Sequence, residues 1–259
     1  MSSISGISGV SSYSLYGQIA SGNKLPSAAN GASELTIAEK QDSQIRGTNA
    51  GTNNLQSGKD VLNITDAALS GVTDYLQRIR ELALQASNTA TVTDSDRRNI
   101  QKEVDQLKQG IQDIASQTQY NTLNLLDGSN GNGFQLATDS NGNSVTINNS
   151  VNSTLDALGI KDFDVTKDFD LNSIDDALNK VNSQRSQGGA QSNRLDHAIS
   201  YNSVAAYNTL AARSRLTDTD YPKAVSELKK QETLQTYAFM MQKKKMEEEA
   251  RKMQNFWIK

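Results

Sequence analysis

Apolar residues in the first half of the chain recur with heptad spacing. One row consists of Leu62, Leu69, Leu76 and Ala83, and a second row three residues further on consists of Thr65, Val72, Ile79 and Ala86. This a/d pattern is typical of a helix that packs lengthwise against another helix. It predicts a long helix that begins near Asn53 and carries a narrow apolar seam.

A second helix is indicated after a short polar break at Thr91–Asp96, where Asp94 or Ser95 is expected to be the N-cap. Its apolar positions then alternate between spacings of four and three residues. Because the break is short, the two helices should lie antiparallel, with Leu69 and Leu76 against the second helix. The predicted seam comprises Leu62, Leu69, Val72, Leu76, Ile79, Ile100, Val104, Leu107, Ile111 and Ile114.

The middle of the chain changes character. Residues 134–138 and 144–148 alternate apolar and polar side chains, and the segment between them contains the dipeptide Asn141-Gly142. Asn-Gly between two short strands favours a hairpin turn. We therefore expect a small β-hairpin region within about residues 130–168.

Helical patterns return on both sides of this region. Weak helices are expected at 4–20 and 33–45, and stronger ones at 173–185 and 190–216, with a break at Ser186–Gly189. Pro222 favours the start of a final helix that runs toward Lys259. The fold class that follows is mainly α, a long antiparallel helical coiled-coil rod with a small β-hairpin region.

Composition bears on how such a rod is stabilised. Only 36% of the 259 residues are hydrophobic, and two are proline. Each Leu buried in a thin seam contributes only about 1.5–3 kcal/mol, so weakly apolar chain ends are stabilised best by neighbouring copies. Head-to-tail contacts that do not close produce helical filaments, and the sequence therefore favours an assembly subunit over an enzyme.

Charge and terminal sequence exclude several other classes. The 26 basic and 29 acidic residues give a net charge of −3, so no nucleic-acid or membrane partner is expected. The chain has no cysteine, which excludes disulfides and thiolate metal sites. Residues 1–17 lack the basic and apolar regions of a cleaved signal peptide, so export would need another route.

Candidate chemistry is sparse. The single histidine, His197, has no second His or Cys to act with, and an exposed helical position is the better interpretation. Asp127 and Asp139 lie in Asn-rich loops without the spacing of a calcium-binding EF-hand. We expect no catalytic residue, no cofactor and no metal. For Lys243–Lys245 and Glu247–Glu249, a solvated helix with pairs such as Lys243–Glu247 is favoured over a partner-docking strip.

Specific strings resemble the bacterial flagellins. They are Tyr75–Asn88 (YLQRIRELALQASN), Gln119–Leu126 (QYNTLNLL) and Asn193–Ile199 (NRLDHAI), with Ser21-Gly22 and Gln44–Gly47 resembling the N-terminal signature. Their order and spacing agree with the family over nearly the whole chain. The short middle segment is similar to that of flagellins without large outer domains. The charged strip at 243–252 departs from the family pattern.

The resemblance implies an architecture and a function. The terminal helices would pair as a coiled coil in a polymerisation domain formed by residues 1–34 and 220–259, and residues 35–219 would form the rod. The chain would be exported by the flagellar type III channel and polymerise with itself into the extracellular filament used for motility. An export chaperone and a filament cap protein would be further partners.

The resemblance also implies a receptor contact. Gln77, Arg78, Leu82 and Glu103 match residues through which many flagellins are sensed by an animal Toll-like receptor. These four residues are expected to form one lateral patch, used between subunits in the filament and by the receptor in the monomer. Packing of Leu82 in the seam and an Arg78–Glu103 pair within one subunit are the competing interpretations.

Three rival classes remain open at this point. A hook–filament junction protein shares the terminal helices of flagellins but usually lacks the full block around Arg78. A secreted immune-modulating adhesin would act as a monomer and would not need polymerising ends. A flagellin with a protease insert is disfavoured by the single histidine and the short middle segment.

Overall fold

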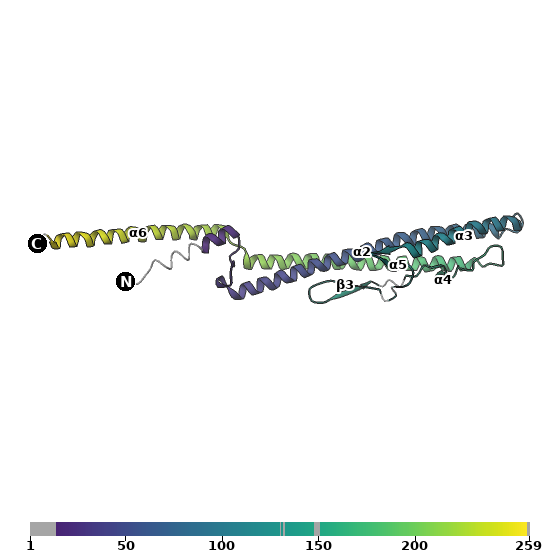
Figure 1. Cartoon of the computed structure of the whole chain (residues 1–259), viewed down its shortest axis with the longest axis horizontal. Helices are drawn as coiled ribbons and strands as arrows, with labels where there is room; N and C mark the ends of the chain where they lie inside the picture. Colours follow the sequence, from purple (N-terminus) through teal and green to yellow (C-terminus); the bar gives the residue numbers. More distant parts are fainter. Residues whose placement is uncertain (1–13, 130, 132, 148–150, 258–259) are drawn as a thin grey trace. The chain divides into compact units, whose positions relative to one another are not determined.

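The computed structural model describes residues 14–129, 131, 133–147 and 151–257 (Figure 1). Residues 14–21 are helical, while the expected helix positions 4–13 and strand position 148 lie outside the described residues. The elements that follow are η1 (Ala28–Asn30), α2 (Ala32–Ala86), α3 (Asp94–Gln117), β1 (Gln119–Tyr120), β2 (Leu123–Asn124), β3 (Phe134–Ala137), β4 (Ser144–Ile147), α4 (Leu155–Leu158), α5 (Asn172–Thr217) and α6 (Tyr221–Trp257). The fold is mainly α, as the sequence predicted, and it has two small antiparallel hairpins where one was expected.

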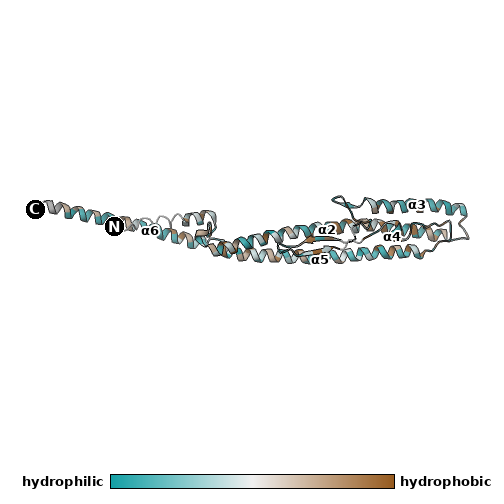
Figure 2. Cartoon of the chain, turned by 60° about the horizontal axis from the view of Figure 1, so that its bottom comes forward, coloured by the Kyte–Doolittle hydropathy of each residue, from teal (hydrophilic) through white to brown (hydrophobic). Residues whose placement is uncertain are grey.

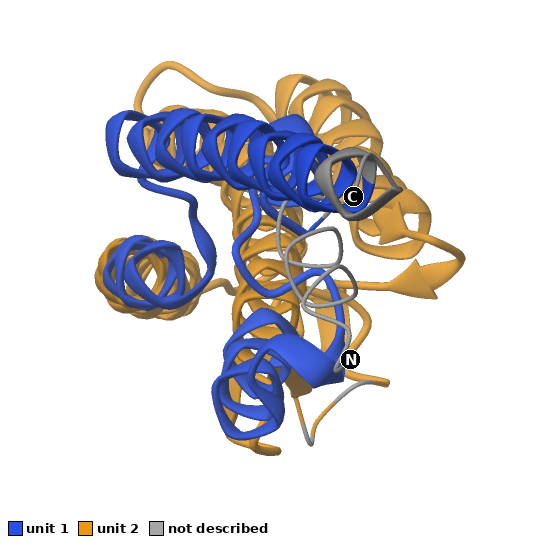
Figure 3. Cartoon of the chain, turned by 90° about the vertical axis from the view of Figure 1, so that its left-hand side faces the viewer, with its two compact units in different colours: residues 1–43, 207–259 blue, residues 44–206 orange. Residues whose placement is uncertain are grey.

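The chain divides into two compact units (Figure 3). Unit 1 combines residues 1–43 with 207–259, and unit 2 comprises residues 44–206. One border falls inside α2 and the other inside α5. Unit 1 contains both chain ends, as the predicted polymerisation domain does. The borders of the units differ from the domain borders predicted at 34/35 and 219/220, and those borders remain a prediction.

α2 is one continuous helix of 55 residues. The separate helices expected at 33–45 and from Asn53 onward are therefore wrong. The sequence favoured a break because glycine costs a helix roughly 1 kcal/mol relative to alanine. At Gly47 and Gly51 the helix instead approaches another segment so closely that a Cβ would overlap Ser140 and the Thr138 carbonyl group.

α3 begins with a capping box. Thr93 is the N-cap, and its hydroxyl accepts a hydrogen bond from the Asp96 backbone N–H at 3.3 Å. In return, the Asp96 carboxylate accepts a hydrogen bond from the Thr93 backbone N–H at 3.0 Å. The expected caps, Asp94 and Ser95, are wrong by one and two residues, because Thr93 has the extended backbone and the acidic residue three positions later that a capping box requires.

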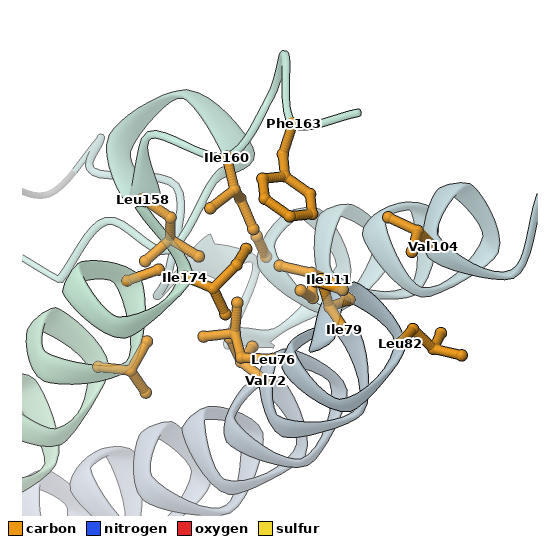
Figure 4. Packing of buried hydrophobic residues seen from close by; sticks show 14 of the residues in the cluster. Val72, Leu76, Ile79, Leu82, Val104, Ile111, Leu158, Ile160, Phe163 and Ile174 are labelled. Atoms are coloured by element: carbon orange, nitrogen blue, oxygen red, sulfur yellow. The ribbon is translucent and has the colours of Figure 1, made fainter. Parts of the chain in front are cut away.

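The main core of unit 2 lies along α2 and α3 and extends to α4 and the start of α5 (Figure 4). Leu76, Ile79 and Ile111 are fully buried there, and Leu158 and Ile174 come from the later elements. Of the predicted seam, the buried residues are Leu62, Leu69, Val72, Leu76, Ile79, Ile100, Val104 and Ile111, and the partly buried ones are Leu107 and Ile114.

Leu62 belongs to a second cluster. It is buried with Leu55, Ile147 of β4 and Leu195 of α5, not with the other seam residues. Since α3 has 24 residues, an antiparallel partner of that length covers α2 only from about Leu62 onward. In the part of α2 that precedes Leu62, the β3–β4 hairpin and α5 complete the burial of its apolar side.

The β3–β4 hairpin pairs Phe134 with Ile147 and Ala137 with Ser144. Its loop covers residues 138–143, where Asp139 accepts hydrogen bonds from the backbone N–H groups of Asn141 and Asn143. Gly142 has a positive φ of 84°, whereas the φ of Asn141 is not positive. Asn141-Gly142 therefore does not form a type I′ turn, which needs a positive φ at both central residues. The hairpin was predicted correctly, and its turn is longer than expected.

Three short elements between residues 119 and 158, β1, β2 and α4, were not predicted. β1 and β2 form a tight hairpin whose turn residues, Asn121 and Thr122, have φ of 46° and 67°. α4 is a single turn capped by the Thr154 hydroxyl. The segment after α4 is held against α3 by Lys108, whose Nζ donates hydrogen bonds to the carbonyl groups of Lys161 and Phe163 at 2.6 and 3.0 Å.

α5 is continuous over 46 residues. The break expected at Ser186–Gly189 is wrong. Val181 and Leu195 are buried on either side of the two glycines, and Arg185 pairs with Asp66 of α2 at 2.8 Å. These contacts outweigh the low helix propensity of Gly188 and Gly189, which is only a weak determinant of where a packed helix ends.

Within unit 1, the two chain ends are connected by hydrogen bonds. The Lys24 backbone N–H donates to the Thr217 carbonyl at 2.7 Å, and the Tyr16 hydroxyl donates to Glu232 of α6 at 2.6 Å. Ala224 and Leu228 at the start of α6 are buried. These contacts join the terminal segments, although α6 is exposed at every residue from 232 to 253.

Candidate assembly surface

Arg78 and Glu103 meet on an exposed face of unit 2, where α2 and α3 lie antiparallel. Arg78 Nε and Nη2 donate hydrogen bonds to Glu103 Oε1 at 2.9 and 2.8 Å, and Nη1 donates to Glu81 Oε2 at 3.1 Å. The Glu103 hydrogen bond is the largest cause of a raised pKa of the Arg78 guanidinium. The side chains of Arg78 and Glu103 are 50% and 46% exposed, so this fixed guanidinium remains accessible to a partner.

The other two residues of the predicted patch differ in their surroundings. Gln77 is exposed beside Arg78. Leu82 is only 3% exposed and belongs to the main core, where Figure 4 labels it with Val104 and Ile79. Leu82 as a surface member of the patch is therefore wrong, and the competing interpretation, packing of Leu82 in the seam, is confirmed. It lies three residues after Ile79, on the side of the helix that faces α3, and the match of residue type could not reveal this.

A second arginine on α2 makes a comparable contact in another direction. Arg80 Nε donates a hydrogen bond to Asp175 Oδ1 of α5 at 2.6 Å, and this hydrogen bond is the main cause of a lowered pKa of Asp175. Arg78 therefore joins α2 to α3, whereas Arg80 joins α2 to α5. The Arg80 side chain is as exposed as that of Arg78, which makes it a matched comparison.

An open groove lies at the end of the rod where α2 turns into α3. Its volume is about 710 Å³. Leu84 is exposed to solvent at this groove. Glu81 also lines the groove, and its carboxylate accepts the hydrogen bond from Arg78. The groove is lined by Glu81, Leu84, Gln85, Asn88, Thr91, Val92, Asp96, Asn99 and Ile100. Sequence reasoning did not single it out, because Leu84 lies off the heptad rows.

Chemical sites are sparse in the described part of the chain. No group of three or more His, Cys, Asp or Glu side chains there is placed to hold a metal ion. His197 is exposed on α5, next to Asp196, which pairs with Lys59 at 2.6 Å. Over the same residues, none of the helices combines the length and apolar content of a bilayer-spanning segment.

Long helices, hydrogen-bonded chain ends and exposed ion pairs define a structural assembly protein. Two family profiles match the chain, the bacterial flagellin N-terminal helical region over residues 11–131 and the bacterial flagellin C-terminal helical region over residues 171–248. Together they cover most of the sequence. The chain belongs to the bacterial flagellin family.

Known proteins agree with this assignment. The chain is 33% identical over 236 residues to a flagellar filament 31.3 kDa core protein of Treponema maltophilum, covering 84% of this chain and 82% of that protein. The crystal structure of Bacillus cereus flagellin is similar with a TM-score of 0.50 and 29% identity, over 58% of this chain and 88% of that one. The protein is a structural subunit of the flagellar filament, which is extracellular.

A flagellar hook-associated protein is also similar in fold. The putative hook-associated protein of Vibrio parahaemolyticus matches with a TM-score of 0.58 over 73% of this chain and 98% of that one. Its sequence identity is only 16%, so this similarity extends to the fold alone. The sequence similarity to a filament protein favours the filament subunit over the rival junction protein.

Proposed function

We propose that the chain polymerises with itself through both chain ends and through a lateral face centred on Arg78. The observation that carries this proposal is the Arg78 guanidinium, which Glu103 and Glu81 hold in place on an exposed surface. Arginine is often an interface hot spot because its planar donor groups bind carboxylates and carbonyl groups with defined geometry. Pre-ordering of the side chain lowers the entropy cost of a contact with a neighbouring subunit.

The same face is proposed to contact a host Toll-like receptor in the free monomer. Gln77, Arg78 and Glu103 support this because they are accessible and adjacent. Leu82 would support the face from below by fixing the position of α2 against α3. Contact with a receptor and contact between subunits would then exclude each other, since both need the same exposed atoms.

Export and partners follow from the family membership as further proposals. We infer type III export of the chain, with a chaperone before secretion and a cap protein at the growing filament end. The exposed length of α6 supports the chaperone proposal, since an unpartnered terminal helix needs a cover before assembly. We assign the chain no catalytic activity, because its family is a structural one.

Arg78→Ala tests the lateral face, and Arg80→Ala is the matched control. Both changes remove an exposed arginine from α2 together with one interhelical ion pair. Critical concentration for seeded polymerisation and affinity for purified receptor ectodomain would be measured for each variant. The proposal expects Arg78→Ala to raise the critical concentration and weaken receptor binding, while Arg80→Ala changes neither. Equal behaviour of the two variants would contradict it.

A further inference from the structure

The second half of α6 presents an unpartnered apolar row. Phe239, Met246 and Met253 follow one another at intervals of seven residues, so they lie along the same side of the helix. Their exposed fractions are 70%, 65% and 66%. Apolar and polar residues alternate along α6 in Figure 2. A row of this kind is the pattern by which one helix packs lengthwise on another.

Two blocks of opposite charge flank the centre of this row. The lysine block is Lys243–Lys245, the glutamate block is Glu247–Glu249, and Met246 lies between them. Within the described part of α6, the ion pair present joins Lys230 and Glu227, and none joins the two blocks. The two blocks are exposed, as expected for a solvated helix, but the expected Lys243–Glu247 pair within it is wrong. Both blocks are left fully available for another chain.

We propose that two copies of the free chain pair through the second halves of their α6 helices, antiparallel and centred on Met246. In this register, Met246 of one copy lies opposite Met246 of the other. Phe239 lies opposite Met253, because each is seven residues from the centre. The lysine block lies opposite the glutamate block, because each begins one residue from Met246.

Other registers fail on charge or on the apolar row. Parallel helices in register would place lysines beside lysines and glutamates beside glutamates, which is destabilising. Parallel helices offset by four residues would bring Lys243 beside Glu247, but Met246 would then face Gln242 and Ala250. The antiparallel register satisfies both patterns at once, and this dual match identifies a second copy as the partner.

Such a pair would be closed. The two copies are related by a two-fold axis at Met246, so each uses the same surface and no further copy can join through it. Subunits of a helical filament all point in one direction, and the antiparallel pair cannot be part of that lattice. The pair is therefore a reversible form of the free chain that competes with polymerisation.

Charge reversal in the full-length chain tests the pairing by sedimentation velocity at low salt, without filament seeds. The unmodified chain should show a concentration-dependent dimer that weakens as salt is added. Replacing the lysine block by three glutamates, or the glutamate block by three lysines, should leave monomers. Mixing those two variants should restore a dimer, and the variant with the blocks exchanged should dimerise by itself. A dimer unaffected by either triple replacement would overturn the proposal, as would a monomeric unmodified chain.

Direction is tested by cross-linking, because the chain has no cysteine of its own. Gln242→Cys and Ala250→Cys each lie four residues from Met246 and leave the apolar row intact. Antiparallel pairing predicts a disulfide between the two variants when they are mixed, and much less for either variant alone. Efficient self-linking of Gln242→Cys would show parallel pairing and overturn the proposal. Seeded filament growth is scored separately, so failure of this dimer leaves the filament assignment intact.

Discussion

Arg78 of α2 donates two hydrogen bonds to a single carboxylate oxygen of Glu103 in α3, at 2.9 and 2.8 Å. Both side chains are about half exposed, at 50% and 46%. Exposed ion pairs contribute little to folding even when their geometry is good. The pair is thus better suited to ordering a surface arginine than to holding the rod together.

A charge exchange separates these two roles. Arg78→Glu places three carboxylates together and should lower the melting temperature modestly. Combining it with Glu103→Arg should restore the melting temperature by reforming the pair in reverse. Polymerisation should remain impaired in the double variant, because the arginine would then project from α3. Recovery of polymerisation along with thermal stability would mean that the pair acts only within the subunit.

The main core gives a test of burial. Leu76 of α2 is fully buried in the main core, whereas Leu84 on the same helix is exposed. Leu76→Ala should reduce the free energy of unfolding by roughly 2–5 kcal/mol, the cost of a cavity in a packed core. Leu84→Ala should be nearly neutral. Chemical denaturation monitored by circular dichroism would measure both, and a larger loss for Leu84→Ala would invalidate the seam.

The glycines of α2 and α5 should respond oppositely to alanine. A Cβ at Gly51 would overlap the Thr138 carbonyl group of the hairpin loop, which is backbone and cannot rotate away. Gly188 has no atom within 4 Å of its Cβ position. Gly188→Ala should therefore raise helix stability by about 0.5–1 kcal/mol, whereas Gly51→Ala should destabilise by displacing the hairpin.

Thermal melts of these two variants would reveal the difference. Hydrogen exchange at the β3–β4 amides adds a local measurement, since only displacement of the hairpin would accelerate it. Stabilisation by both substitutions would contradict the close packing of the hairpin on α2.

The capping box predicts a response to acid. Hydrogen bonds from the Thr93 hydroxyl and backbone N–H lower the pKa of Asp96 below its ordinary value of 3.8. A lowered pKa in the folded state gives stability that is present above pH 3.8 and is lost as pH falls through the folded-state pKa. Melting temperatures measured from about pH 5 to about pH 2 should therefore fall less steeply for Asp96→Asn than for the unmodified chain.

Thr93→Ala provides the control, because it removes the hydroxyl's hydrogen bonds while keeping the Asp96 carboxylate and the backbone N–H that donates to it. It should lower stability by roughly 1 kcal/mol at neutral pH, as loss of an N-cap does. It should also flatten the acid response, but less than Asp96→Asn does, because the backbone N–H of residue 93 still donates to the carboxylate. An unchanged pH profile in both variants would show that Asp96 does not contribute to acid sensitivity.

Much of the fold was predictable because it depends on local periodicity. The heptad rows of α2 located Leu69 and Leu76 in the core, and the alternating pattern around Asn141-Gly142 located the hairpin. The helix breaks were wrong at Gly47 to Gly51 and at Gly188 to Gly189. In both places contacts with distant segments keep the helix continuous, and no local sequence pattern carries that information.

The candidate surface was predictable in part. The residue match brought Arg78 and Glu103 into one patch, and the structure places their side chains in contact. It also included Leu82, which is buried, because a match of residue type does not report which side of a helix a residue occupies. The apolar row of α6 could be a contact surface or part of a core on sequence alone, and only its exposure in the structure indicates a contact surface.

Seeded growth tests the filament assignment most directly. Purified full-length chain would be added to short filament fragments, and filament length would be followed by electron microscopy alongside the concentration of unassembled protein. A filament subunit elongates the fragments until the unassembled protein reaches a constant critical concentration. Fragments that keep their length, with all added chain remaining as monomer or dimer, would contradict the assignment.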